Sequence, residues 1–239
     1  MNRYFGQIVV NNVTLNEDDL FHLTKVLRTR IGERIEVVIN CACAVYEIVS
    51  FNPFKLKFVE DIWFNSELEN DVSLFYCLSK GDKIDFAIQK ATELGVKEIV
   101  LFDSKYSVVK YDKKDIDKKL KRFADIAKSA AEQSHRLVIP EVKGVYRFED
   151  IDKFLKDYNF LAYEKESVDT NDTLSKFKSI KPGASVSIMI GSEGGFAEEE
   201  VDLLNKKGLI NISLGKRILR TETAVVSALA QLNLVLESK

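Results

Sequence analysis

The residues best suited to chemistry lie in two short loops near the end of the sequence. The apolar run SVSIMI is followed by GSEGGF, where Gly191, Gly194 and Gly195 surround the carboxylate of Glu193. Further along, the second loop reads LGKRILRTET. Glycines permit positive φ angles and a close approach of the backbone to a ligand. Because loops at the carboxyl ends of parallel strands bind ligands in open α/β sheets, both loops are candidates for one site.

The glycine-rich loop has three readings: a tight strand-to-helix connection, a phosphate cradle, or a site for a cationic ligand. Glu193 argues against phosphate, because a carboxylate inside the loop would repel it, and no GKS or GKT follows. S-adenosylmethionine has no phosphate and carries a sulfonium cation. A loop of free backbone amides with one carboxylate is compatible with that cofactor.

Together the two loops carry a family resemblance. IGSEGGFAEEE followed by LGKRILRTETAVVSAL resembles the paired cofactor loops of the SPOUT-superfamily 16S ribosomal RNA uracil-N3 methyltransferases, whose usual wording is GPEGGF and then LGPRILRTET. HLTKVLRTRIGERI, KGDKIDFAIQKATELGVKEI and AAEQSHRLVIPEV extend the resemblance over nearly the whole length. Ser192 and Lys216 replace prolines, Tyr106 replaces arginine, and His135 replaces glycine. We expect looser loops in the free protein and one altered RNA contact.

The resemblance implies an α/β fold with two domains. Residues 1–70 would form a small PUA-like RNA-binding β-barrel, and residues 71–239 a SPOUT methyltransferase domain with a deep trefoil knot. It also implies a homodimer that uses S-adenosylmethionine, and no metal, to methylate N3 of one uridine in the small ribosomal subunit. The implied cofactor-binding residues are Ile190, Gly191, Glu193, Gly194, Gly195, Leu214, Gly215, Leu219, Arg220, Thr221 and Thr223.

Methylation at N3 of uracil needs an in-line approach to the methyl group, a proton acceptor, and a donor for the charge that develops on the base. Arg220 is the candidate for stabilising the uracil anion, and its alternative role is to brace the loops through Glu222 or Glu193. Glu222 is a candidate proton acceptor or an orienting group. Thr221 is expected to cap the last helix, with a bond to the cofactor as the alternative.

RNA would have to meet local basic patches, because the net charge of −2 gives no overall attraction. One patch runs from His22 to Arg34 and another from Lys105 to Lys128; each can also be a solvated face. The candidates for RNA contact, taken from the resemblance and from their place near the catalytic face, are Lys25, Arg28, Arg30, Lys80, Lys83, Lys90 and Arg136.

The elements that must position these residues follow two different patterns of secondary structure. In the first part, RYFGQIVV, ERIEVVIN, AVYEIVS and KLKFVED are predicted strands around a short helix capped by Asn16. From about residue 70, strands VSLFYCL, KEIVLF, NFLAY, SVSIMI and NISL alternate with helices. The first predicted helix follows VSLFYCL, has Ile84, Ala87, Ile88 and Ala91 on one face, and stops at Gly95. Further helices are predicted over about 115–134, near 148–158, over AEEEVDLLNKK, and from Thr221 onward. This alternation indicates a mainly parallel sheet covered by helices.

The helix after Thr221 carries an apolar stripe that fits either core packing or a subunit interface. Its members are Val225, Ala228, Leu229, Leu232 and Leu236.

Cysteine and histidine usage indicates neither disulfides nor zinc. Cys41, Cys43 and Cys77 are odd in number, and His22 and His135 stand apart from them without ligand spacing. Cys41 and Cys43 are expected on one buried face of a strand, and His22 as a packing or capping residue. No apolar run approaches the roughly 20 residues that span a bilayer, and the start lacks a signal-peptide pattern, so we expect a cytoplasmic protein.

Two alternatives to the uridine-N3 reading follow from the same residues. One is a SPOUT methyltransferase that acts on another base or on ribose, because the cofactor loops do not identify the acceptor. The other is a non-catalytic RNA-binding factor of ribosome assembly that has kept the fold.

Overall fold

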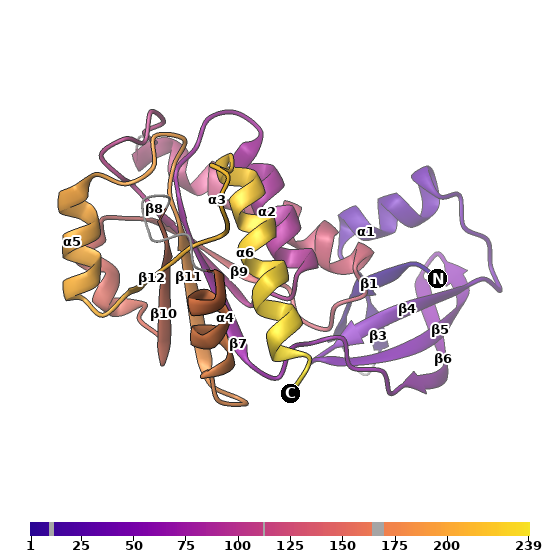
Figure 1. The fold of residues 1–239 in the computed structure, drawn as a ribbon. Helices are drawn as coiled ribbons and strands as arrows, with labels where there is room; N and C mark the ends of the chain where they lie inside the picture. Colours follow the sequence, from indigo (N-terminus) through magenta and orange to yellow (C-terminus); the bar gives the residue numbers. More distant parts are fainter. Residues whose placement is uncertain (10–11, 112, 164–169) are drawn as a thin grey trace. The chain divides into compact units, whose positions relative to one another are not determined.

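The computed structural model describes residues 1–9, 12–111, 113–163 and 170–239, which form two compact units (Figure 1). The first unit, here called the N-terminal unit, contains Met1–Glu67 and Ala131–Val138. The second, the C-terminal unit, contains Leu68–Ala130 and Ile139–Lys239. Each has its own hydrophobic core.

The N-terminal unit is built on an open sheet. Its strands are β1 (Arg3–Phe5), β4 (Arg34–Ile39), β5 (Ala42–Phe51) and β6 (Phe54–Ile62), in the order β1-β4-β5-β6, while β2 (Gln7–Val9) and β3 (Asn12–Thr14) form a separate pair. The predicted strand RYFGQIVV divides at Gly6, where a Cβ would lie 2.5 Å from Cγ1 of Val37. Among the described residues the strands do not close into a barrel.

A short helical segment completes this unit. Asn16 caps α1 (Glu17–Phe21) as predicted, because its side chain accepts a hydrogen bond from the Asp19 amide at 2.8 Å. The helix continues into a π-helical turn, η1 (His22–Val26). His22, expected to pack or to cap, is the C-cap residue of α1; its side chain is exposed, and its Nδ1 lies 3.0 Å from the Tyr4 hydroxyl.

The two neighbouring cysteines do not share a buried face. Cys43 is buried in β5, but Cys41 is exposed in the turn before it, with φ of 64°. The expectation of two core cysteines was wrong for Cys41, because the chain turns there instead of continuing an extended strand.

A six-stranded parallel sheet forms the C-terminal unit. Its strand order is β12-β10-β11-β7-β8-β9. Every pairing is parallel, as the alternation of strands and helices predicted. The strands are β7 (Asp71–Cys77), β8 (Glu98–Phe102), β9 (Glu141–Tyr146), β10 (Tyr158–Ala162), β11 (Ser185–Ile190) and β12 (Ile210–Ile212). The helices are α2 (Lys83–Glu93), α3 (Lys113–Gln133), the 3-10 helix η2 (Phe148–Lys153), α4 (Thr170–Lys178), α5 (Glu198–Lys206) and α6 (Thr221–Leu236).

Helices cover both faces of this sheet (Figure 1). Leu74 and Tyr76 of β7 belong to a core shared with α2, α3, α4 and α6. Phe75 and Cys77, which alternate with them, belong to a second core shared with η2 and α5. Side chains on alternate sides of a strand explain why both cores draw on the same strands.

Most helices agree with the sequence pattern, and the differences have local causes. The apolar positions Ile84, Ala87, Ile88 and Ala91 are buried as predicted, and α2 ends before Gly95, where φ is +84°. The helix expected over 148–158 is only the 3-10 turn η2, because β10 begins at Tyr158. The strand β9 and the helix α4 were not predicted. None of the described helices is both long and apolar enough to cross a membrane.

Candidate active site

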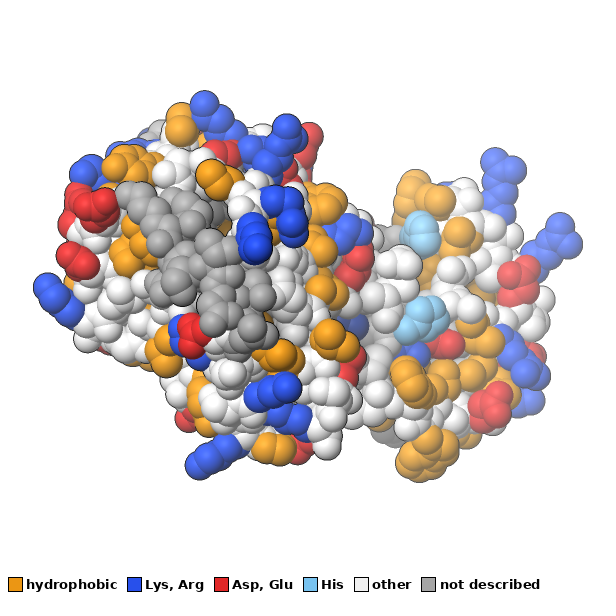
Figure 2. Space-filling model, viewed as in Figure 1, with side chains coloured by type: hydrophobic (Ala, Val, Ile, Leu, Met, Phe, Trp, Pro, Cys, Tyr) orange, Lys and Arg blue, Asp and Glu red, His pale blue; other side chains and the backbone are white. Residues whose placement is uncertain are grey.

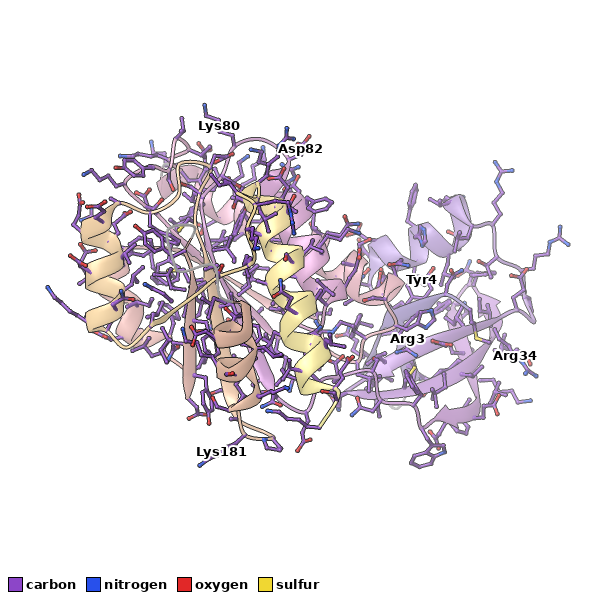
Figure 3. All side chains as sticks on the ribbon, viewed as in Figure 1. Arg3, Tyr4, Arg34, Lys80, Asp82 and Lys181 are labelled. Atoms are coloured by element: carbon purple, nitrogen blue, oxygen red, sulfur yellow. The ribbon has the colours of Figure 1, made fainter. Side chains whose placement is uncertain are left out.

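The carboxyl ends of two strands in the parallel sheet bring the two loops together. The glycine-rich loop (191–197) follows β11, and the second loop (213–220) follows β12, which lies two positions away with β10 between them. In Figure 3, Lys80 and Asp82 lie at the end of the sheet where the strands have their carboxyl ends, and Lys181 lies at the opposite end. A cavity of about 500 Å³ lies between the loops. Its volume is in the range typical of sites for small ligands.

Nearly all predicted cofactor-binding residues line this cavity. Thr223 is the exception: it is exposed on α6 and takes no part in the lining. Sequence reasoning missed Ala162 and Tyr163, which line the cavity from the end of β10. The motif NFLAY predicted the strand but not its place between β11 and β12. The predicted lining residues are Ile190, Gly191, Glu193, Gly194, Gly195, Leu214, Gly215, Leu219, Arg220 and Thr221.

A positive φ angle explains the glycine at only some positions of the two loops. Gly195 has φ of 69° and Gly215 of 118°, whereas Gly191 and Gly194 are not in the left-handed region. A Cβ on Gly191 would lie 2.9 Å from the Phe196 ring, and one on Gly194 would lie 2.6 Å from Cβ of Tyr106. Gly191 and Gly194 therefore allow the loop to pack closely against the protein itself.

Glu193 joins the glycine-rich loop to the loop after β7. Its carboxylate accepts hydrogen bonds from the Lys80 amide at 2.9 Å and from the Lys83 ammonium at 3.0 Å. Burial raises the pKa of Glu193, but the Lys80 amide, its own amide and Lys83 lower it by more, so the net pKa is below its ordinary value. An ionised carboxylate therefore faces the cavity, and Lys83, expected to contact RNA, is paired with it.

Thr221 holds the two loops together and does not cap the helix. The N-cap of α6 is Arg220, so the capping prediction for Thr221 was wrong. The Thr221 hydroxyl is buried and donates to the Gly191 carbonyl at 2.6 Å. It also lies 3.2 Å from the hydroxyl of Tyr76, whose pKa is raised to about 12, chiefly by burial.

The two predicted catalytic residues have different surroundings. Arg220 is exposed, and within the described ranges its guanidinium makes no ion pair, so it does not brace Glu193 or Glu222. Glu222 has one carboxylate oxygen, Oε2, that is buried without a hydrogen-bond partner in the described part of the chain. A free guanidinium and an unsatisfied carboxylate oxygen thus flank Thr221 at the start of α6.

The candidates for RNA contact differ in their exposure and in their ion pairs. Lys25, Arg28 and Arg30 are exposed in the N-terminal unit, where Figure 2 shows basic side chains projecting. Lys80 is also exposed, whereas Lys90 pairs with Glu93 at 2.8 Å.

Arg136 is not available to RNA. It is 2% exposed, and its guanidinium pairs with Glu67 at 2.5 Å. The prediction that Arg136 contacts RNA was therefore wrong, because sequence alone did not show that its segment folds into the N-terminal unit.

Comparisons with known proteins identify the family to which the chain belongs. A model of the RNA methyltransferase domain matches residues 66–233. Ribosomal RNA small subunit methyltransferase E of Bacillus subtilis (strain 168) is 34% identical over 251 residues, which cover 98% of this chain and 96% of the relative.

Two solved structures cover the chain from end to end. The ribosomal RNA small subunit methyltransferase E from Neisseria gonorrhoeae, bound to S-adenosyl methionine, is 27% identical with a TM-score of 0.83 and covers 98% of each chain. A putative methyltransferase from Legionella pneumophila, in complex with the same cofactor, is 26% identical with a TM-score of 0.85 and covers 98% of this chain and 97% of its own. The family expected from the two loop motifs is confirmed. The chain belongs to the RNA methyltransferase family.

Proposed function

We propose that this protein transfers a methyl group from S-adenosylmethionine to N3 of one uridine in 16S ribosomal RNA. The observation that carries the proposal is the cavity between the two loops, with Glu193 and the exposed Arg220 among its lining residues. Relatives named for small-subunit ribosomal RNA methylation match this chain over most of its length, and one of them binds S-adenosyl methionine.

The lining of the cavity fits this cofactor. Ile190, Leu214 and Leu219 provide apolar surface, and the glycine-rich loop provides backbone amides. The ionised Glu193 suits a cationic ligand and opposes a phosphate. The cofactor would supply an activated methyl group. Gly191, Gly195 and the apolar residues would hold it, so that the chain's own task is to position the base and manage its proton.

Arg220 and Glu222 would perform that task. Loss of the N3 proton leaves negative charge on uracil, and the free guanidinium of Arg220 can donate to the uracil oxygens. Glu222 does not line the cavity, and its buried Oε2 has no partner among the described residues, which suits an orienting role better than direct proton acceptance. We therefore assign anion stabilisation to Arg220 and orientation to Glu222, with proton acceptance as its alternative role.

The N-terminal unit would supply RNA affinity. Lys25, Arg28 and Arg30 are exposed, and phosphate contacts of this kind give affinity without sequence choice. We assign a PUA-like RNA-binding role to residues 1–70 and the methyltransferase role to residues 71–239, with the assembled small subunit in the cytoplasm as the substrate.

A trefoil knot and a homodimer belong to the same proposal. We infer the knot from the resemblance of the two loop motifs. The second loop returns from β12 and bonds Gly191 through Thr221, and α6 then packs on α2 and α4. Most of the apolar stripe of α6 is buried in its own core, including Val225 and Leu232, so it is not available to a partner. Leu234 of α6 and Ile218 of the second loop are exposed, and we propose them for a subunit contact.

Calorimetric titration tests the cofactor assignment. We expect S-adenosylmethionine to bind one site per chain and ATP not to compete, because ATP would place phosphates beside Glu193. Absence of binding would contradict the proposal and favour a non-catalytic RNA-binding factor. Competition by ATP would favour a nucleotide site in this cavity.

A further inference from the structure

A third loop, outside the two loop motifs, contacts the glycine-rich loop. This loop, residues 103–107, follows β8 and is called here the β8 loop. It meets the region 192–200 at Ser192, at Gly194 and at Glu200, and at the surface through the ion pair of Lys105 with Glu199. Neither Ser104 nor Glu200 lines the cavity, so contacts with a ligand there do not explain them.

Glu200 bridges two backbone segments. Its Oε2 accepts a hydrogen bond from the Ala197 amide at 2.9 Å, as the carboxylate of a capping box at the start of α5. Its Oε1 accepts from the Lys105 amide, in the β8 loop, at 2.6 Å. Both contacts need an acceptor oxygen, and a carboxylate supplies two. Glu200 therefore fixes the end of the glycine-rich loop to the β8 loop.

Three buried serines make a second connection. Oγ of Ser104 lies 2.8 Å from Oγ of Ser107 and 3.4 Å from Oγ of Ser192. Ser107 donates in turn to the Leu78 carbonyl at 3.1 Å, so the cluster also reaches the end of β7. All three serines are buried. A satisfied polar network in a buried place holds its members in one arrangement.

Gly194 provides the third contact. A Cβ at this position would lie 2.6 Å from Cβ of Tyr106, so the backbone of the glycine-rich loop lies directly against the β8 loop. The contacts at Glu200, at the serines and at Gly194 together restrain the glycine-rich loop on the side where Tyr106 packs.

We propose that Glu200 and Ser104 are positioning residues that hold the glycine-rich loop in its cofactor-binding form before the cofactor arrives. The inference rests on the proposed function, since it requires S-adenosylmethionine to bind in this cavity. When only a fraction of molecules has the competent loop, the apparent dissociation constant rises by the inverse of that fraction. Preorganisation therefore acts on cofactor affinity, and the rate at saturating cofactor is preserved.

The test compares Glu200→Gln with Glu199→Gln. An amide has one acceptor oxygen, so Glu200→Gln leaves one of the two backbone donors without a partner. Glu199→Gln removes the same charge one residue away, where the side chain is 65% exposed and contacts the Lys105 ammonium at the surface. Calorimetry and single-turnover kinetics would be measured for both variants, with thermal unfolding as a check on folding.

We expect Glu200→Gln to raise the dissociation constant of S-adenosylmethionine about tenfold, with a near-normal rate at saturating cofactor, and Glu199→Gln to bind as the wild type does. Ser104→Ala, which removes the connection through the serines and leaves the Glu200 carboxylate in place, should shift affinity in the same direction. Equal affinities for Glu200→Gln and Glu199→Gln, or a lost rate at unchanged affinity, would overturn the inference. If the wild type itself does not bind S-adenosylmethionine, the proposed function fails instead.

Discussion

Arg220 and Thr221 are neighbours with opposite surroundings, and this contrast assigns their roles. The Arg220 side chain is exposed, whereas the Thr221 hydroxyl is buried against Gly191. A conservative change at Arg220 should therefore affect chemistry without loosening the fold. Arg220→Lys keeps the positive charge but loses the planar set of donors that matches the uracil oxygens.

We expect Arg220→Lys to lower the single-turnover rate about a hundredfold, with little change in cofactor or RNA affinity. Raising the pH should partly restore the rate, because more uracil is then already deprotonated. Rapid-quench measurements with labelled cofactor would test this. A near-normal rate, or a slow rate explained entirely by weak cofactor binding, would show that Arg220 only shapes the site.

The two threonines that flank Glu222 give a matched pair. Thr221→Val removes the donor to the Gly191 carbonyl and should lower the free energy of unfolding by about 1–3 kcal/mol, together with cofactor affinity. Thr223 lies on the exposed side of α6, so Thr223→Val should change the free energy of unfolding by less than about 0.5 kcal/mol. Urea denaturation would measure both, and equal effects would argue against a link between the loops through Thr221.

At the scale of elements, Glu193 makes the contact between the glycine-rich loop and the loop after β7 depend on pH. Its pKa in the folded protein lies below the ordinary value of 4.5. The stabilisation is therefore complete above that ordinary value and is lost as the pH falls through the lowered one.

The difference in unfolding free energy between the wild type and Glu193→Gln should thus be largest at neutral pH. It should shrink in acid below about 4.5, where Glu193 takes up a proton. Urea denaturation across this range measures it. A difference that stays constant with pH would mean that the carboxylate contributes nothing through its charge.

The sequence predicted the elements of the site better than their contacts. Alternation of strands and helices, with buried positions such as Ile84 and Ala91, was enough for the parallel sheet. The order of the strands could not be predicted from this alternation, because the pairing of β10 between β11 and β12 depends on long-range packing. Glu200 was not singled out for the same reason: its partner, the Lys105 amide, is remote in the chain.

At the scale of the whole molecule, affinity for RNA and chemistry should be separable. Arg28→Ala with Arg30→Ala removes two exposed charges from the N-terminal unit and leaves the cofactor cavity unchanged. RNA binding should weaken, and the slope of log K against log salt should fall by about 1.5 units. Cofactor affinity should stay constant.

The control is Lys55→Ala with Lys57→Ala, which removes the same charge from exposed positions on β6. Filter binding over a range of salt concentrations would compare the two pairs. If both flatten the slope equally, the contribution is general electrostatics and not a site at Arg28 and Arg30.

Methylation of defined RNA tests the central claim most directly. Small ribosomal subunits that lack the modification would be incubated with the protein and labelled S-adenosylmethionine, and their RNA then copied by reverse transcriptase. A methyl group on N3 blocks the pairing edge of uracil, so we predict label in 16S RNA and one new stop at a uridine, both absent with Arg220→Ala. Label that enters ribose or another base, without a stop at a uridine, would contradict the account.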